Sequence, residues 1–260
     1  MNVVHITARD NALVKQLRKL ALDPGAYRKY GQIWVEGDHL CRAALERGWR
    51  PAWVVIAARV WGRLPESWYA GAERIAVLED GLFAQISTLE SPASMGFLLD
   101  WKADEQADFA PGVNSVVLDR IQDAGNVGSI LRSASALGFK QVLALKGTAA
   151  LWSPKVLRAG MGAHFGLQLY EGLTLTQLDT LQVPLLVTHL QGSKQLHEAA
   201  LPAPCAWVLG HEGQGVQHAL VQRAAMLLRI AQPGGEESLN VAAAAAICMH
   251  ASCVAQLSSV

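Results

Sequence analysis

Short apolar runs alternate with helical segments through the second half of the chain, and this alternation constrains the fold most strongly. Strands that are buried on both faces have such continuous apolar runs, and helices connect them in parallel sheets. The pattern predicts an α/β fold with a mostly parallel sheet, followed by a last long helix that begins near Ser238. The expected strands are residues 116–118, 142–145, 185–188, 206–209 and 227–230.

The first hundred residues predict a second, smaller α/β unit. Helices are expected at residues 11–22, 38–47 and 80–86, and strands at residues 32–36, 53–57, 74–78 and 95–101. Residues 102–112 lack hydrophobic periodicity and contain Pro-Gly, as linkers do. We therefore expect a first domain at 1–101, a linker at 102–113 and a second domain at 114–260.

Composition excludes several classes of protein. Hydrophobic residues make up 51% of the chain and charged residues 17%, which is typical of a globular protein and not of a disordered one. We expect no signal peptide, and no apolar run approaches the roughly 20 residues that span a bilayer. The cysteines form no metal-binding pattern, so we expect free thiols, no metal and an intracellular location. They are Cys41, Cys205, Cys248 and Cys253.

Charge is distributed unevenly, although the net charge of the whole chain is zero. Residues 1–63 contain eleven Lys or Arg against five Asp or Glu. Such a stretch suits an RNA phosphate backbone, but an ordinary solvated helix face fits equally well on charge alone. The candidate RNA-binding residues are Arg9, Lys15, Arg18, Lys19, Arg28 and Lys29.

Polar and glycine-rich clusters follow three of the predicted strands, at the strand ends where open α/β sheets bind ligands. The first cluster runs from Asp119 to Arg132, and Asn126 is suited to cap its helix. The second is Gly210 to Gly215, and the third is Ile230 to Val241. Each cluster also has an ordinary structural explanation when it is considered alone. The arginine of the first could be a surface charge, the second could be a tight turn, and the third could be the start of a closely packed helix. The second cluster does not match a dinucleotide or P-loop pattern.

Together the three clusters resemble the signature motifs of the SpoU family of RNA ribose 2′-O-methyltransferases, in the order and spacing of that family. Residues 153–163 resemble a further family segment. Residues 8–100 are similar to the family's ribosomal-protein-like RNA-binding domain, most clearly at 27–29 and 35–37. The chain departs from the family at Ala124, Gly160 and Ala231-Gln232. The motif residues are Asn126, Gly128 and Arg132; Gly210, Glu212 and Gly215; and Ser238, Leu239, Asn240 and Val241.

The resemblance implies a C-terminal trefoil knot and transfer of a methyl group from S-adenosylmethionine to a ribose 2′-hydroxyl of structured RNA. It also implies a cytoplasmic homodimer that joins through the knotted domain and needs no metal. The two-domain layout favours ribosomal RNA over transfer RNA as the substrate. The implied residues for S-adenosylmethionine are Thr188, Leu209, Gly210, Glu212, Gly215, Ile230 and Leu239.

Arg132 matches the family arginine that is assigned to catalysis. Because a guanidinium keeps its proton at neutral pH, we expect it to bind a phosphate or stabilise the developing alkoxide, not to act as a base. The residues implied to orient it, the ribose and the donor are Asn126, Glu212, Ser238 and Asn240.

Two other functions fit parts of the pattern. A non-catalytic RNA-binding or assembly factor could keep this fold, but the presence of Arg132, Glu212 and Asn240 disfavours it. A nicotinamide-dependent dehydrogenase would need a fingerprint that the chain lacks. Stabilisation by S-adenosylhomocysteine or by NAD would distinguish these classes.

Overall fold

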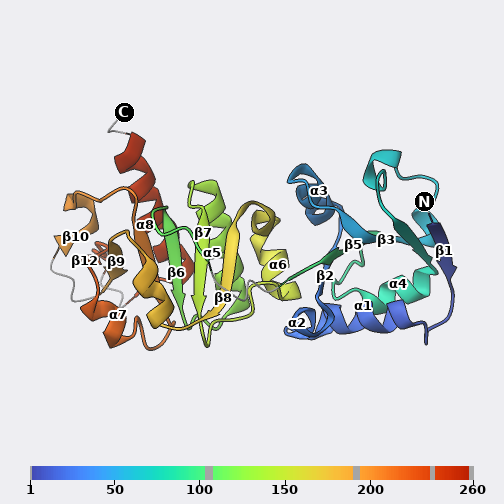
Figure 1. The fold of residues 1–260 in the computed structure, drawn as a ribbon, viewed down its shortest axis with the longest axis horizontal. Coiled ribbons are helices and arrows are strands. Elements are labelled where there is room, and N and C mark those ends of the chain that lie inside the picture. The colour runs from blue at the N-terminus through green and yellow to red at the C-terminus, as the bar shows by residue number, and fades with distance from the viewer. Residues whose placement is uncertain (1, 103–107, 190–193, 235–237, 258–260) are drawn as a thin grey trace. The chain divides into compact units, whose positions relative to one another are not determined.

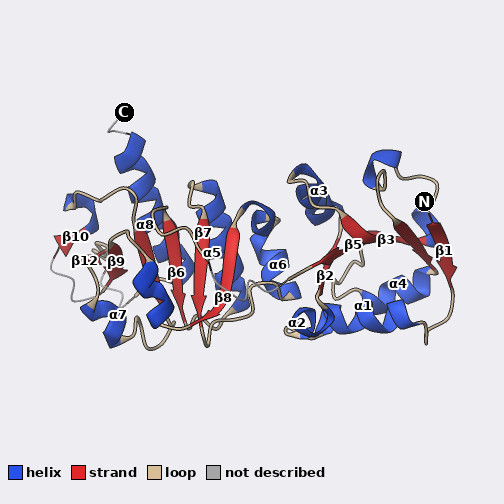
Figure 2. Ribbon diagram, in the orientation of Figure 1, coloured by secondary structure: helices blue, strands red, loops and turns tan. Residues whose placement is uncertain are grey.

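The computed structural model describes residues 2–102, 108–189, 194–234 and 238–257. The chain divides into two compact units (Figure 1). Unit 1 comprises Met1–Ala103 and Trp152–Phe165, and unit 2 comprises Asp104–Leu151 and Gly166–Val260. Helices and strands alternate along both units (Figure 2), which confirms the predicted α/β class.

Unit 1 contains a five-stranded mixed sheet with the order β1-β4-β3-β5-β2. The strands β1, β4 and β3 are parallel, whereas β5 is antiparallel to both β3 and β2. The strands are β1 (Asn2–Ile6), β2 (Gln32–Glu36), β3 (Pro51–Ala57), β4 (Arg74–Leu78) and β5 (Met95–Asp100).

The first helix of unit 1 follows from an amphipathic segment with a good N-cap. Asn11 accepts a hydrogen bond from Leu13 N at 2.9 Å and so begins α1, whose buried residues include Val14 and Leu17 at helical spacing. The α-helices are α1 (Ala12–Leu22), α2 (Ala26–Tyr30), α3 (Asp38–Glu46), α4 (Asp80–Ile86) and α6 (Pro154–Gly160). The 3₁₀ helices are η1 (Ala58–Val60), η2 (Glu66–Trp68) and η3 (Ala163–Gly166).

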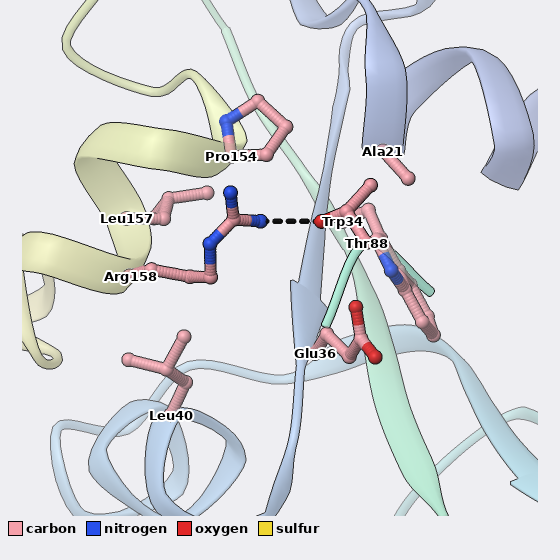
Figure 3. Close-up of a pocket in the computed structure, with 8 residues that line it drawn as sticks. All are labelled: Ala21, Trp34, Glu36, Leu40, Thr88, Pro154, Leu157 and Arg158. Carbon is pink, nitrogen blue, oxygen red and sulfur yellow. Dashed lines mark hydrogen bonds between the residues drawn. The ribbon is translucent and has the colours of Figure 1, made fainter. Parts of the chain in front are cut away.

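A small cavity lies where α6 packs near β2 within unit 1 (Figure 3). Arg158 extends from α6 and donates a hydrogen bond from Nη1 to Thr88 Oγ1 at 2.6 Å. The cavity contains no residue of the three clusters, so it is not the site that the sequence predicts. Its lining residues are Ala21, Trp34, Glu36, Leu40, Thr88, Pro154, Leu157 and Arg158.

Unit 2 contains a seven-stranded sheet with the order β10-β12-β9-β11-β6-β7-β8. Every neighbouring pair of strands is parallel, so the prediction of a mostly parallel sheet is confirmed. The strands are β6 (Ser115–Asp119), β7 (Gln141–Leu145), β8 (Gln168–Leu173), β9 (Leu185–Thr188), β10 (Lys194–Gln195), β11 (Ala206–Gly210) and β12 (Met226–Arg229).

The helices of unit 2 complete its core. The helix α8 packs against both α5 and β11, and Trp207 Nε1 on β11 donates to Ser252 Oγ on α8 at 2.9 Å. All residues of β6 and β7 are buried, as expected for strands covered on both faces. The helices are α5 (Ala124–Ala136), α7 (His218–Gln222) and α8 (Val241–Leu257), with the 3₁₀ helices η4 (Thr176–Thr180) and η5 (Leu196–Glu198).

The end of the predicted linker takes part in unit 2. Phe109 lies in the core and is 4% exposed. The backbone N–H of Ala110 donates to Gln141 Oε1, and Gln141 Nε2 donates to the backbone carbonyl of Ala110. The middle of that linker, residues 103–107, lies outside the described residues. The domain boundaries remain predictions.

Two further properties concern the whole described chain. All four cysteines are free, and three of them are buried. Among the helices that the structure describes, none is long and apolar enough to cross a membrane.

Candidate functional site

The neighbouring strands β6 and β11 bring two of the three clusters together. They are parallel, and Asp119 at the end of β6 is paired with Gly210 at the end of β11. The loops that follow both strands therefore leave the same edge of the sheet. This is the edge at which open α/β sheets bind ligands.

The loop after β11 closes on itself around Gly210. His211 and Gly215 exchange two backbone hydrogen bonds, and His211 Nδ1 accepts from the N–H groups of Gly213 and Gln214 at 3.0 and 3.2 Å. A Cβ atom on Gly210 would lie 2.2 Å from Val216 N, so no other residue fits there without a backbone shift. We call residues 210–217 the glycine loop.

The carboxylate of Glu212 binds the first cluster. It accepts hydrogen bonds from Gln122 N at 3.2 Å, Asp123 N at 3.1 Å and Asn126 Nδ2 at 3.1 Å. Burial alone would raise the pKa of this carboxyl, but the hydrogen bonds outweigh burial and lower the pKa. Glu212 is therefore ionised at neutral pH, and it joins the second cluster to the first.

The third cluster is joined to the first through two asparagines. Asn240 Oδ1 accepts from Ala242 N at 2.9 Å and Ala243 N at 3.3 Å, which caps α8 and leaves the amide nitrogen as donor. That nitrogen donates to Asn126 Oδ1 at 2.9 Å, and Asn126 Nδ2 in turn donates to Glu212. A directed chain from Asn240 through Asn126 to Glu212 thus connects all three clusters.

The helix α5 begins earlier than expected. The prediction of Asn126 as its N-cap is wrong, because Asp123 is the cap and accepts from Asn126 N at 2.8 Å. Asn126 lies within the first turn, where its side chain is free to bind Glu212 and Asn240. The last helix was expected to begin near Ser238, and α8 begins at Val241 with Asn240 as its cap.

Arg132 lies on α5, two turns beyond the junction of the three clusters. It is exposed, as is Ser129 one turn earlier on the same helix. Within the described part of the chain, the Arg132 guanidinium has no hydrogen bond and no ion pair. It is therefore available to a substrate.

The remaining predicted residues lie at or near the same strand ends. Thr188 and Gly210 end β9 and β11, and Ile230 follows β12, which is the other neighbour of β9. Thr188 and Ile230 are half-buried, Leu209 is buried, and Leu239 next to Asn240 keeps 39% of its surface exposed. Ser238 is exposed and makes no hydrogen bond to another described residue. The third cluster's residues 235–237 lie outside the described residues.

Asp119 and Arg120 begin the first cluster but were not named as site residues, and Gln217, at the end of the glycine loop, was not singled out; the structure brings these three together. Asp119 is fully buried and accepts hydrogen bonds from both other residues. A charged residue directly after an apolar strand is a signal for such a site, but its partner Gln217 is too distant in sequence to infer. Among the described residues, no group of His, Cys, Asp and Glu could hold a metal ion.

Known proteins match this chain over both units. Residues 114–250 match the SpoU rRNA Methylase family, and residues 11–96 match the MRM3-like substrate binding domain. The chain belongs to the SpoU rRNA methylase family. Membership confirms the predicted family and enzyme class, an RNA methyltransferase that uses S-adenosylmethionine.

One relative and one solved structure span nearly the whole length of this SpoU methylase, and a second relative matches about half of it. The 23S rRNA (guanosine(2553)-2′-O)-methyltransferase RlmP of Bacillus subtilis is 28% identical over 248 residues, 94% of this chain and 97% of that protein. The RlmB 23S rRNA (guanosine-2′-O-)-methyltransferase of Bordetella pertussis is 31% identical over 53% of this chain and 58% of its own. The crystal structure of an AdoMet-bound rRNA methyltransferase from Sinorhizobium meliloti is 25% identical, with a TM-score of 0.83 over 96% of this chain and 97% of that one.

Proposed function

We propose that this protein transfers the methyl group of S-adenosylmethionine to a ribose 2′-hydroxyl of ribosomal RNA. The observation that carries the proposal is the hydrogen-bonded chain Asn240–Asn126–Glu212, which joins the three family motifs at one edge of the sheet. The named relatives modify 23S ribosomal RNA at guanosine 2′-oxygens, which supports ribosomal RNA as the substrate class. The same substrate implies a cytoplasmic location.

The residues at this edge fit S-adenosylmethionine. Ile230 and Leu239 offer partly exposed apolar surface for an adenine ring, and Gly210 brings backbone groups to the same edge. Gln232 Oε1 is buried without a hydrogen-bond partner in the described structure, so it can accept from a bound ligand. The remaining proposed contacts are Thr188, Leu209, Glu212 and Gly215. S-adenosylmethionine supplies a methyl group that is already activated on a sulfonium.

The chain's own residues position the ribose and stabilise charge. Arg132 contributes a fixed positive charge for an RNA phosphate or for the alkoxide that develops on the 2′-oxygen. Asn126, Asn240 and Ser238 orient the reacting groups around it, and Glu212 keeps the asparagine chain in place. Alignment of the oxygen with the methyl group supplies much of the rate enhancement. We also propose the C-terminal trefoil knot that the family resemblance implies.

Donor binding is the first expected result. We expect S-adenosylhomocysteine to bind the purified protein in a calorimetric titration and to raise its melting temperature, while NAD does neither. The edge formed by Gly210, Ile230 and Leu239 provides the binding surface. Absence of binding up to millimolar ligand, with RNA present, would contradict the proposed donor site.

The basic residues of unit 1 are proposed to hold the RNA. Lys15 and Lys19 are exposed one turn apart on α1, and Arg28 and Lys29 are exposed on α2. Arg9 is exposed just before α1. Arg18 differs because its Nη2 donates to Gln85 Oε1 at 2.8 Å, so it also joins α1 to α4.

Removing Lys15 and Lys19 together is expected to weaken RNA binding and to reduce its salt dependence. For every phosphate that a lysine no longer neutralises, the salt slope of binding should fall by roughly 0.7 to 0.9, because fewer counterions are released. The measurement is a titration of labelled RNA at several salt concentrations. Arg59→Ala is the matched control, since Arg59 already binds Asp80 and Ser94. If the salt slope of RNA binding is unchanged in the double variant, these lysines belong to an ordinary solvated helix face and do not contact the RNA.

The proposed homodimer has a candidate surface on α8. Its exposed residues follow one another at alternating intervals of four and three positions in the sequence. This spacing places them on one face of the helix and is typical of a helix that packs against another helix. Ile247, Val254 and Leu257 keep 41%, 46% and 73% of their surfaces exposed, which is unusual for large apolar side chains on one helix face. The full set is Ala243, Ile247, His250, Val254 and Leu257.

Light scattering is expected to give about twice the chain mass of 27.9 kDa. Ile247→Asp with Val254→Asp should give the monomer mass, because a charge in an apolar contact is not solvated. Leu22→Asp is the control, since Leu22 is 65% exposed on unit 1 and lies away from this helix in sequence. A wild-type monomer with full activity would contradict the dimer.

A further inference from the structure

Arg120 occupies an unusual backbone position at the end of β6. Its φ of 59° lies in the left-handed region, which residues other than glycine rarely adopt. The conformation is held by Thr148, whose hydroxyl accepts from Arg120 N at 3.1 Å and donates to Leu118 O at 3.0 Å. Strain of this kind is often found at functional sites. Here it directs the side chain toward Asp119 and the glycine loop.

One side of the Arg120 guanidinium binds a buried carboxylate. Nε donates to Asp119 Oδ1 at 2.8 Å and Nη2 to Asp119 Oδ2 at 3.2 Å. Gln217 completes the set, with its backbone N–H at 2.7 Å and Nε2 at 2.8 Å from the same carboxylate. The hydrogen bond to Asp119 raises the pKa of Arg120, so the guanidinium stays protonated.

The other side of the guanidinium binds the glycine loop. Nη1 donates to Gln214 Oε1 at 2.8 Å, and Nη2 lies 3.5 Å from Gly215 O. Gly147 leaves the space that the arginine stem needs, because a Cβ there would lie 3.2 Å from Arg120 Cγ. A single side chain therefore connects the buried end of β6 to the middle of the loop.

We infer that Arg120 is a positioning residue, which holds the glycine loop in the conformation that binds the methyl donor. The inference rests on the proposed function, because the glycine loop contributes Gly210, Glu212 and Gly215 to the donor site. Arg120 acts through Gln214 and Gly215 and not on the reacting atoms. Its loss should therefore weaken donor binding much more than it slows transfer at saturating donor.

The test changes Gln214, since removing Arg120 leaves Asp119 buried with half of its partners and can unfold the protein. Gln214→Glu keeps the contact as an ion pair, whereas Gln214→Lys places a second cation against Arg120. We expect calorimetry to give S-adenosylhomocysteine affinity for Gln214→Glu within about threefold of wild type, and for Gln214→Lys at least fivefold weaker. In steady-state assays with S-adenosylmethionine, Gln214→Lys should raise KM by a similar factor and leave kcat within about twofold.

The same two substitutions of Gln214 in an Arg120→Gln protein show whether their effect depends on the contact with Arg120 or only on the charge added at position 214. In Arg120→Gln, which keeps a hydrogen-bond donor for Asp119, the difference between Glu and Lys at position 214 should fall below twofold. Arg223→Ala is the matched control, because Arg223 binds Asp179 and Leu175 O elsewhere in unit 2. If Arg120→Gln does not fold, the comparison of Gln214→Glu with Gln214→Lys in the otherwise wild-type protein tests the inference by itself.

Equal affinities for Gln214→Glu and Gln214→Lys, or the same difference in the Arg120→Gln background, would overturn the inference. A lower kcat for Gln214→Lys without a change in its KM for S-adenosylmethionine would also overturn the inference. These outcomes can be distinguished from failure of the proposed function. If the proposed function is wrong, the wild-type protein itself will not bind S-adenosylhomocysteine.

Discussion

Arg132→Ala is expected to lower the rate of methyl transfer at least a hundredfold, which corresponds to about 2.7 kcal/mol in activation free energy. The Arg132 side chain is exposed, has no bond to the rest of the described chain and lies near the junction of the three motifs. Its charge is thus available to the RNA. Because it is exposed and makes no hydrogen bond or ion pair with another described residue, its removal should leave the free energy of unfolding within about 0.5 kcal/mol of wild type.

Single-turnover assays on ribosomal RNA measure this effect, together with calorimetry for the donor. Donor affinity should stay within about twofold of wild type, since Arg132 is assigned to the RNA side of the reaction. Arg132→Lys should not restore the rate if planar, bidentate geometry is needed. Arg223→Ala, which removes a bonded surface arginine of unit 2, serves as the control and should keep the wild-type rate. A wild-type rate in Arg132→Ala would show that the assigned role is wrong.

Gly210→Ala is expected to weaken S-adenosylhomocysteine binding at least a hundredfold, or about 2.7 kcal/mol. The added Cβ would lie 2.2 Å from Val216 N and 2.3 Å from Gly215 C. These are backbone atoms and cannot move without opening the glycine loop. Opening the loop would displace Glu212 and Gln214, which bind the first cluster and Arg120.

Gly213→Ala provides a matched control within the same loop. A Cβ on Gly213 would meet only the His211 ring, at an ordinary distance of 3.8 Å. Calorimetry should give a dissociation constant within about threefold of wild type for this variant. Circular dichroism should show both variants folded, because Val208 and the rest of β11 remain in the core. Equal donor affinity in the two alanine variants would contradict the proposed role of the closed loop.

Regular hydrophobic patterns predicted much of the fold. The bounds of β2, β4, β9 and α4 agree with the sequence expectation residue for residue. The strands β1 and β8 were not expected, and both lie at sheet edges with few buried residues. A strand that buries so few residues shows little apolar periodicity, so its sequence resembles a loop; β2 also lies at an edge, but its three central residues are buried.

The candidate site was predictable where it depends on motif residues and not where it depends on long-range pairing. Glu212, Asn126 and Asn240 were named, but nothing in the sequence showed that they form one hydrogen-bonded chain. The buried Asp119 binds Gln217, which is 98 positions away along the chain. Such a pair depends on the parallel pairing of β6 with β11. Asp123 and Asn126 are both good caps, so local preference alone could not decide between them.

The central claim is tested most directly by following labelled methyl groups into RNA. Purified protein is incubated with ribosomal RNA and S-adenosylmethionine that carries a deuterated methyl group, and the RNA is digested to nucleosides for mass spectrometry. We predict that the label appears on a ribose and that the modified nucleotide resists alkaline cleavage, because a methylated 2′-oxygen cannot attack the adjacent phosphate. Label on a base, or no label in any ribosomal RNA while the donor still binds, would contradict the account.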